Sequence, residues 1–362
     1  MAKFKIILTS DYEVWGNGSG CVERCVINPA AQILDIADKY NAPVTFFFDV
    51  CEYWAFEEIE KSGGFENDYR PATMMRLQLQ DAIKRNHDVQ LHFHPQWLSY
   101  QFISNQSWKL DYRYWRLSKV NDFHNSDWNL EKLFLKGKET LEELFKAIKP
   151  TYNVHSFRAG AWCIQPEEEV VNAMKTAGIL VDSTVAPKAS YNDGRTVYDF
   201  SKSPVKKAFW PFSKNVQTVD EHGAFLEIPI STAKVNLLRR MYYVGLKYLH
   251  KIDRTPEKCT QLRDENENNA SRSIGSIKKL LRNKYQMLNF SDATKSQEMI
   301  HICTRVMRKY DKLNMEEIPI VAISHPKTFG NPKEFERFMH WLSQNEKVSF
   351  GTFQELINKG IK

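Results

Sequence analysis

Short apolar runs of strand length alternate with helical segments along most of this chain. The first runs, at 3–10, 43–50 and 88–93, are separated by predicted helices at 30–40 and 71–85. Further strands are predicted at 155–158, 179–185, 224–228, 319–324 and 348–351. This order favours a mainly parallel sheet covered by helices. We therefore expect an α/β fold, a distorted (β/α) barrel of about seven strands. An open doubly wound sheet is the alternative, but no Gly-rich phosphate loop follows the first strand.

Two stretches interrupt the alternation. Residues 95–130 hold four tryptophans, Trp97, Trp108, Trp115 and Trp128, at spacings that fit no single helix face. These aromatic side chains either line a groove for a sugar ring or pack the insertion onto the protein. Residues 234–311 form a second insertion, basic and mostly helical, with a polar loop near 264–273. We expect 1–362 to be one barrel domain carrying both insertions.

The charge and the apolar segments exclude several classes of protein. A net charge of +6 over 362 residues, without a dense basic face or a known motif, argues against nucleic-acid binding. The basic stretch 234–284 is either a solvated helical face or a peripheral contact with an anionic membrane. No apolar run approaches the ~20 residues of a transmembrane helix. The N-terminus lacks the features of a signal peptide, so we expect a cytoplasmic protein.

Ligand-type and charged side chains gather at the carboxyl ends of the predicted strands. In chain order they are Asp11 and Glu13, His92 and His94, Arg158, Asp182, and His325. In a barrel, these strand ends meet on one face, and that face holds the active site. Each residue alone has a plainer explanation, such as a turn, a helix cap or an ordinary ion pair. Their joint occurrence at equivalent strand ends indicates a catalytic site.

Spacing refines this interpretation. Side chains alternate along a strand, so Asp11 and Glu13 share one face, and His92 and His94 share another. Imidazoles and carboxylates are the ligands of zinc and similar divalent ions in catalytic sites, where a position stays open for water. We therefore expect a divalent metal, most simply zinc, as the cofactor of a hydrolytic enzyme.

These motifs resemble those of the polysaccharide deacetylase family, also called the NodB-homology or carbohydrate esterase family 4 superfamily. The stretch 9–13 (TSDYE) is similar to the family's first motif, and 86–95 (NHDVQLHFHP) resembles its histidine motif. Arg158 with Trp162 matches the third motif, Asp182 the fourth, and Ile323-Ser324-His325 the fifth. The likeness covers 9–326 in short motifs and is greatest to a divergent branch linked to lipopolysaccharide and surface-polysaccharide biosynthesis.

The resemblance implies a role for each matched residue. Asp11 would be the general base, and Glu13, His92 and His94 would hold the metal. Arg158 would orient Asp11, His325 would protonate the leaving amine, and Asp182 would fix the tautomer of His325. Trp162 would form part of the groove wall, and we expect Trp97 and Tyr12 to contact substrate as well.

The chain departs from the family pattern at two positions. The family's second histidine lies four residues after the first, where this chain has Gln96, so His94 takes that role. The family's metal-binding Asp directly follows the base, where this chain has Tyr12, so Glu13 is the substitute. Asp11 and Glu13 could still exchange roles.

The resemblance implies a metal-dependent hydrolase that removes N-acetyl groups from an acetamido sugar, free or carrier-linked. Two alternatives remain open, an amidohydrolase of a small non-sugar amide and a non-catalytic sugar-binding barrel.

Overall fold

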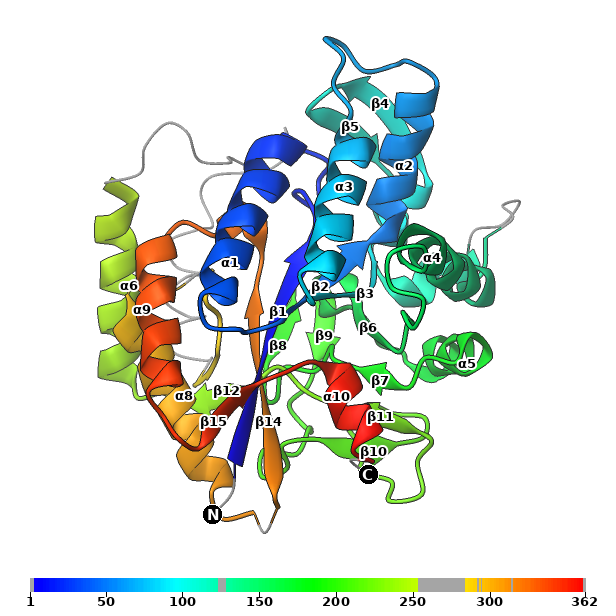
Figure 1. Cartoon of the computed structure of the whole chain (residues 1–362). Helices are drawn as coiled ribbons and strands as arrows, with labels where there is room; N and C mark the ends of the chain where they lie inside the picture. Colours follow the sequence, from blue (N-terminus) through cyan, green and yellow to red (C-terminus); the bar gives the residue numbers. More distant parts are fainter. Residues whose placement is uncertain are drawn as a thin grey trace.

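A curled sheet of parallel strands runs through the centre of the molecule, with helices around it (Figure 1). The computed structural model describes residues 3–122, 128–252, 284–291, 293, 295–313 and 315–360.

Within this part of the chain, seven parallel strands lie side by side in the order β11–β7–β6–β3–β2–β1–β14. Their bounds are β1 (Lys3–Tyr12), β2 (Val44–Asp49), β3 (Asp88–Phe93), β6 (Ser156–Ala159), β7 (Val181–Asp182), β11 (Phe225–Glu227) and β14 (Glu317–Ser324). Past β11 the chain reaches the opposite edge, where Ile230 pairs in parallel with Val321 of β14. The expected distorted α/β barrel is therefore confirmed.

Two short strands extend the main sheet. β10 (Trp210–Phe212) pairs antiparallel with β11, and β15 (Val348–Phe350) pairs with the beginning of β1 at Phe4–Ile6. β15 pairs with the first part of β1, whereas β2 pairs with the later residues Leu8–Tyr12 of the same strand. The carboxyl half of β1 is thus held between β14 and β2.

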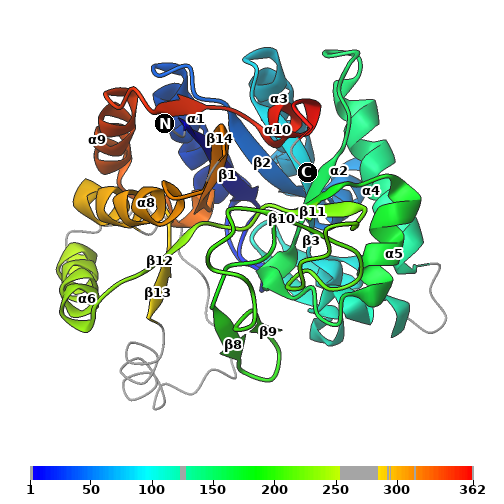
Figure 2. The same cartoon turned by 90° about the horizontal axis from the view of Figure 1, so that it is seen from below.

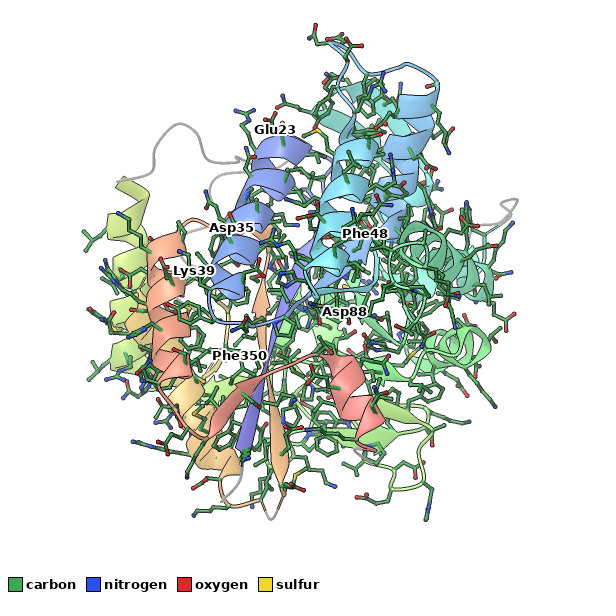
Figure 3. The ribbon with its side chains drawn as sticks, viewed as in Figure 1. Glu23, Asp35, Lys39, Phe48, Asp88 and Phe350 are labelled. Carbon is green, nitrogen blue, oxygen red and sulfur yellow. The ribbon has the colours of Figure 1, made fainter. Side chains whose placement is uncertain are left out.

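Helices cover the outside of the sheet. They are α1 (Asn28–Asp38), α2 (Val50–Lys61), α3 (Pro71–Lys84), α4 (Leu130–Phe145), α5 (Glu168–Ala177), α6 (Leu237–Ile252), α8 (Ser296–Tyr310), α9 (Pro332–Ser343) and α10 (Phe353–Asn358). Seen from below, α8 and α9 lie on the β14 side and α4 and α5 on the opposite side (Figure 2). Lys39, which follows α1, forms an ion pair with Glu336 of α9 at 2.7 Å (Figure 3).

The strands carry unbroken apolar runs because both faces of the sheet are covered. All six residues of β2 are buried, as are Phe4–Tyr12 of β1. Parallel strands covered on both faces lose the polar alternation of exposed sheets. β1 is two residues longer than predicted, so Asp11 and Tyr12 belong to the strand itself. The helix α2 was not predicted, because its sequence VCEYWAFEEIEK has no clear apolar stripe.

The two predicted insertions contain short elements of their own. Residues 95–130 include the antiparallel pair β4 (Tyr100–Ser104) and β5 (Ser107–Leu110), followed by short 3₁₀ helices. After β7, the pair β8 (Ser190–Asn192) and β9 (Val197–Asp199) forms a hairpin. In 234–311, α6 and α8 flank β13 (Tyr285–Met287), which pairs with β12 (Thr232–Lys234). The loop predicted near 264–273 lies outside the described residues.

None of the helices in the described ranges combines the length and the apolarity needed to cross a lipid bilayer.

Candidate metal centre

A buried cluster of one carboxylate and two imidazoles lies at the carboxyl ends of β1 and β3. Glu13, His92 and His94 each offer a ligand atom within 4.8 Å of the others. Oε2 of Glu13 lies 2.6 Å from Nε2 of His94 and 3.4 Å from Nε2 of His92. β3 brings both histidines to this point because they alternate with Phe93, which packs into the core. Three protein ligands of this type are a common set for a catalytic zinc site.

Contacts to the Nδ1 atoms orient the two imidazoles. Nδ1 of His92 lies 2.8 Å from the carbonyl oxygen of Arg158, so this nitrogen carries the proton and Nε2 carries the lone pair. Nδ1 of His94 lies 3.1 Å from the side-chain amide of Gln96. Neither Nε2 makes a hydrogen bond within the described structure, although both are buried and lie close to the Glu13 carboxylate. A divalent cation bound by both nitrogens and the carboxylate would satisfy all three groups.

Lys327 holds the other oxygen of the Glu13 carboxylate. Its Nζ lies 2.6 Å from Oε1 of Glu13 and donates a second hydrogen bond to the carbonyl oxygen of Val14 at 2.8 Å. Burial raises the pKa of Glu13, but the charges of His94 and Lys327 outweigh burial and hold the pKa well below its usual range. Glu13 therefore stays ionised, and its Oε2 atom faces His92 and His94. Sequence reasoning missed Lys327, which lies two residues beyond His325.

A second network surrounds Asp11. One carboxylate oxygen accepts a hydrogen bond from Nη1 of Arg158 at 2.6 Å. The other lies 3.4 Å from Nε2 of His325, whose side chain is 20% exposed. Burial raises the pKa of Asp11, but the charge of Arg158 and the contact with His325 shift it well below the usual range. The structure thus brings Asp11, Arg158 and His325 together beside the Glu13 cluster.

Arg158 is fully buried and connects the two networks. Its guanidinium also donates to Thr9 Oγ1 and to the carbonyl and hydroxyl oxygens of Ser183, and it lies 4.2 Å from the ring centroid of Phe47. Its backbone carbonyl meanwhile fixes His92. A buried cation is tolerated only when its donors are satisfied in this way.

Two further acids lie buried behind the cluster. Asp49 of β2 is paired with His92 of β3 in the parallel sheet. Its carboxylate accepts hydrogen bonds from the backbone N–H groups of Cys51 and His94. Burial raises the pKa of Asp49 to about 7 and that of Glu52 well above its usual value. A raised pKa means that both acids hold a proton more tightly than usual, so the clearly ionised acids here are Asp11 and Glu13, which pair with Arg158 and Lys327.

Asp182 does not take the expected place beside His325. Its carboxylate accepts hydrogen bonds from the backbone N–H and the hydroxyl group of Thr184. Its other close neighbour is Glu227, and burial raises the pKa of both acids, that of Glu227 well above its usual value. β7 contributes only two residues to the sheet, and Asp182 pairs there with Glu227 of β11. Asp182 therefore forms a buried acid pair with Glu227 in place of the predicted contact with His325.

Two residues predicted to contact substrate are instead part of the core. Tyr12 is fully buried, packs between Phe46 and Phe48, and donates a hydrogen bond to Gln78. It lies between Asp11 and Glu13 in sequence, so strand alternation turns it away from the site.

Trp97 is 1% exposed and packs against an aromatic cluster that includes Phe56 and Trp108. Its ring therefore has no free face for a sugar. Trp108 belongs to the same cluster, and Trp128 stacks on Trp54. Most tryptophans of the 95–130 insertion thus pack the insertion onto the rest of the protein.

Trp115 is the tryptophan of this insertion that reaches the metal ligands. Its ring meets the His94 ring edge-on with centroids 6.2 Å apart, and a Cβ atom on Gly16 would lie 2.9 Å from it. Arg195 covers the ring at 4.5 Å. The indole Nε1 is buried and has no hydrogen-bond partner in the described structure. Trp115 therefore offers an unused donor beside the candidate metal centre.

Trp162 is half-buried in a strained turn after Arg158. Ala161 and Trp162 both adopt left-handed backbone conformations, with φ values of 50° and 57°. The Trp162 ring packs edge-on against Tyr198 and contacts the small cluster that includes Ile323, two residues before His325. In the same turn a Cβ atom on Gly160 would lie 2.8 Å from the His94 ring and 2.3 Å from a backbone oxygen. Only glycine fits there.

No protein-family model matches the chain, and no curated protein sequence matches it. Several solved structures overlay on 99% of the chain at low identity. One from Mycobacterium smegmatis, described as a polysaccharide deacetylase, has a TM-score of 0.46 and 11% identity, with 90% of that chain covered. One from Pseudomonas aeruginosa PAO1, described in the same way, has a TM-score of 0.44 and 12% identity, again with 90% covered. Puue allantoinase has a TM-score of 0.47, 11% identity and 90% coverage.

Proposed function

We propose that this protein is a metal-dependent hydrolase that removes the N-acetyl group from an acetamido sugar. The motifs quoted above resemble the polysaccharide deacetylase family, and we place the chain in that superfamily, in its branch linked to lipopolysaccharide and surface-polysaccharide biosynthesis. The substrate would be an acetamido sugar, free or carrier-linked.

One observation carries the proposal. Two acids at the end of one strand are held by different cations, Asp11 by Arg158 and Glu13 by Lys327, each at 2.6 Å. Glu13 faces two imidazole nitrogens that lack hydrogen bonds, whereas Asp11 faces His325. This arrangement separates a metal ligand from a proton acceptor, as amide hydrolysis requires.

Glu13, His92 and His94 would hold the metal, and zinc fits a set of two imidazoles and one carboxylate. When bound, a divalent cation would supply Lewis-acid polarisation of the amide carbonyl and of the attacking water.

The other residues move and hold protons. Asp11 takes the proton of the attacking water on Oδ2, the oxygen that Arg158 leaves free. Arg158 keeps the Asp11 carboxylate ionised and fixes its orientation. His325, the most exposed of these three side chains, gives a proton to the leaving nitrogen when the C–N bond breaks. Trp115 and Trp162 would contact the sugar.

Elemental analysis combined with an acetate-release screen over acetamido sugars tests the proposal. We expect about one metal ion per chain and acetate release from at least one sugar. Asp11→Asn should keep the metal and lose about 10²–10⁴-fold in rate, the usual contribution of a general base. A His92→Ala, His94→Ala double variant should lose both metal and activity. A protein without metal that binds sugars but releases no acetate would refute the proposal and support a binding barrel.

The burial of the candidate ligands favours a second candidate function, an amidohydrolase acting on a small non-sugar amide. Glu13, His92 and His94 are each less than 5% exposed, so a compact substrate would reach them with the least rearrangement. Small amides therefore belong in the same screen, with ammonia and acid release as the readout.

A further inference from the structure

Helix α6 presents an apolar face to solvent. Of the ten large hydrophobic side chains that are exposed in the described residues, six lie on this helix. Leu238 is 80% exposed, Leu249 64%, Tyr242 61% and Met241 52%. These four residues are spaced by three, four, seven and eight positions, so they share one helical face. In both views α6 is an outer helix, beside α8 and far from α4 and α5 (Figures 1 and 2).

The inner side of α6 includes a buried charge. Arg240 is 5% exposed and Tyr243 6%, and both lie on the side of the helix that is turned toward the protein. A surface helix of a water-soluble protein normally turns its apolar side inward. α6 turns an apolar face outward as well, and this exposure costs free energy in water that is recovered when the outer face is covered.

The charges on α6 have a single sign. The sequence of the helix holds Arg239, Arg240, Lys247 and Lys251 but no Asp or Glu. Arg239 also lines a pocket of about 430 Å³ between α6 and α8, beside the exposed rings and chains of the apolar face. An apolar face with a cation at its border, as Arg239 is among the described side chains, is typical of helices that lie in the interface of an anionic membrane.

Gly245 shows that the apolar face is open. It lies among Met241, Tyr242 and Leu249 on the same side of the helix, and a Cβ atom added there would meet nothing within 4 Å. A side chain added at Gly245 would therefore start in open space within the described structure.

We propose that α6 binds the surface of an anionic lipid bilayer, with its apolar side chains between the headgroups and the exposed Arg239 on a lipid phosphate. The positive charge of the helix argues for this occupant over a second copy, because two α6 helices face to face would bring like charges together. The proposal is independent of the reaction that the barrel performs.

Vesicle flotation of the full chain tests the proposal with two substitutions at one position. The vesicles contain phosphatidylcholine with or without about one quarter phosphatidylglycerol. We expect the protein to bind the anionic vesicles, to bind neutral ones at least about tenfold more weakly, and to be released by salt. Gly245→Leu should strengthen binding at least about threefold and Gly245→Glu should weaken it at least about tenfold, since one adds and the other opposes apolar burial in lipid.

Both substitutions replace a helix-interior glycine, so both should preserve the helix, which circular dichroism checks. Leu77→Glu, at a 55% exposed leucine of α3, is the matched control and should leave vesicle binding unchanged. Failure of the unmodified protein to bind anionic vesicles would overturn the proposal. So would a dimer that Gly245→Glu converts to a monomer without any change in vesicle binding, since α6 would then be a subunit interface.

Discussion

Asp11 and Glu13 lie two residues apart at the end of β1, yet each is paired with a different cation at 2.6 Å. Arg158, which holds Asp11, comes from β6, in the middle of the sheet order. Lys327, which holds Glu13, follows β14 at the sheet edge beside β1. The two carboxylates are therefore fixed independently, and the proposed roles of base and metal ligand follow from their separate partners.

Gly160→Ala should disturb the candidate metal centre without touching a ligand. The added Cβ would lie 2.3 Å from the carbonyl oxygen of Phe93 and 2.8 Å from the His94 ring, so one of them has to move. We expect metal affinity to fall about tenfold or more, as for other losses of ligand support, and the melting temperature to drop. Metal titration and thermal unfolding measure the two effects.

Gly245→Ala is the control for this prediction, because its Cβ would enter open space. It should bind metal like the unmodified protein and should not lower the melting temperature. Full metal affinity in Gly160→Ala would show that the close approach to His94 does not position that ligand.

Trp115→Phe should weaken substrate binding while the ring contacts remain. The indole Nε1 is buried without a partner beside His94, so a substrate oxygen is its expected acceptor. Loss of one neutral hydrogen bond corresponds to about a twofold to tenfold rise in KM. Steady-state kinetics on the sugar identified by the acetate screen provide the measurement. Trp128→Phe, at a ring stacked on Trp54, should leave KM unchanged, and an equal rise in both variants would contradict a role for the Trp115 N–H.

Asp88→Asn should stabilise the protein at high pH. Asp88 lies at the start of β3 (Figure 3), and burial raises its pKa from 3.8 to about 6. The folded state therefore binds the proton more tightly than the unfolded state, and stability falls as the pH rises between about 4 and 6. Above that window the full cost of the buried charge remains. Asparagine removes this cost and keeps an oxygen for the N–H of Val89 and the amide of Gln90.

Denaturant unfolding at about pH 4 and about pH 8 measures this effect. We expect Asp88→Asn to gain about 1–3 kcal/mol at the higher pH and less than about 1 kcal/mol at the lower one, from ~1.4 kcal/mol per pKa unit. Asp35→Asn, at an exposed position on α1 (Figure 3), should change stability by less than about 0.5 kcal/mol at both values. A gain of equal size at both pH values would mean that the charge of Asp88 is not its source.

The main features of the sheet could be predicted from sequence because its strands are continuous apolar runs. β3 (Asp88–Phe93) has the predicted bounds, since turn residues mark both ends. The proximity of Glu13, His92 and His94 follows from strand alternation and from the meeting of strand ends on one face.

Other parts of the site depend on tertiary contacts that have no local signal. The pairing of Asp182 with Glu227 needs the register of β7 and β11, which are two and three residues long. No local sequence pattern distinguishes Trp97 from Trp115. The path of the insertion buries Trp97 in the core and brings Trp115 to His94. For Tyr12, the sequence alone was sufficient: side chains alternate along a strand, so a residue between Asp11 and Glu13 has to point away from the site.

β14 and the turn after it provide both His325 and Lys327, while Asp11 and Glu13 stand near the opposite terminus. During synthesis on a ribosome, the first acids emerge more than 300 residues before the lysine and histidine that contact them. Asp11 can meet Arg158 well before then, but Glu13 lacks its paired cation until Lys327 has been synthesised. The candidate site is therefore complete only after β14 and the turn that follows it have been translated.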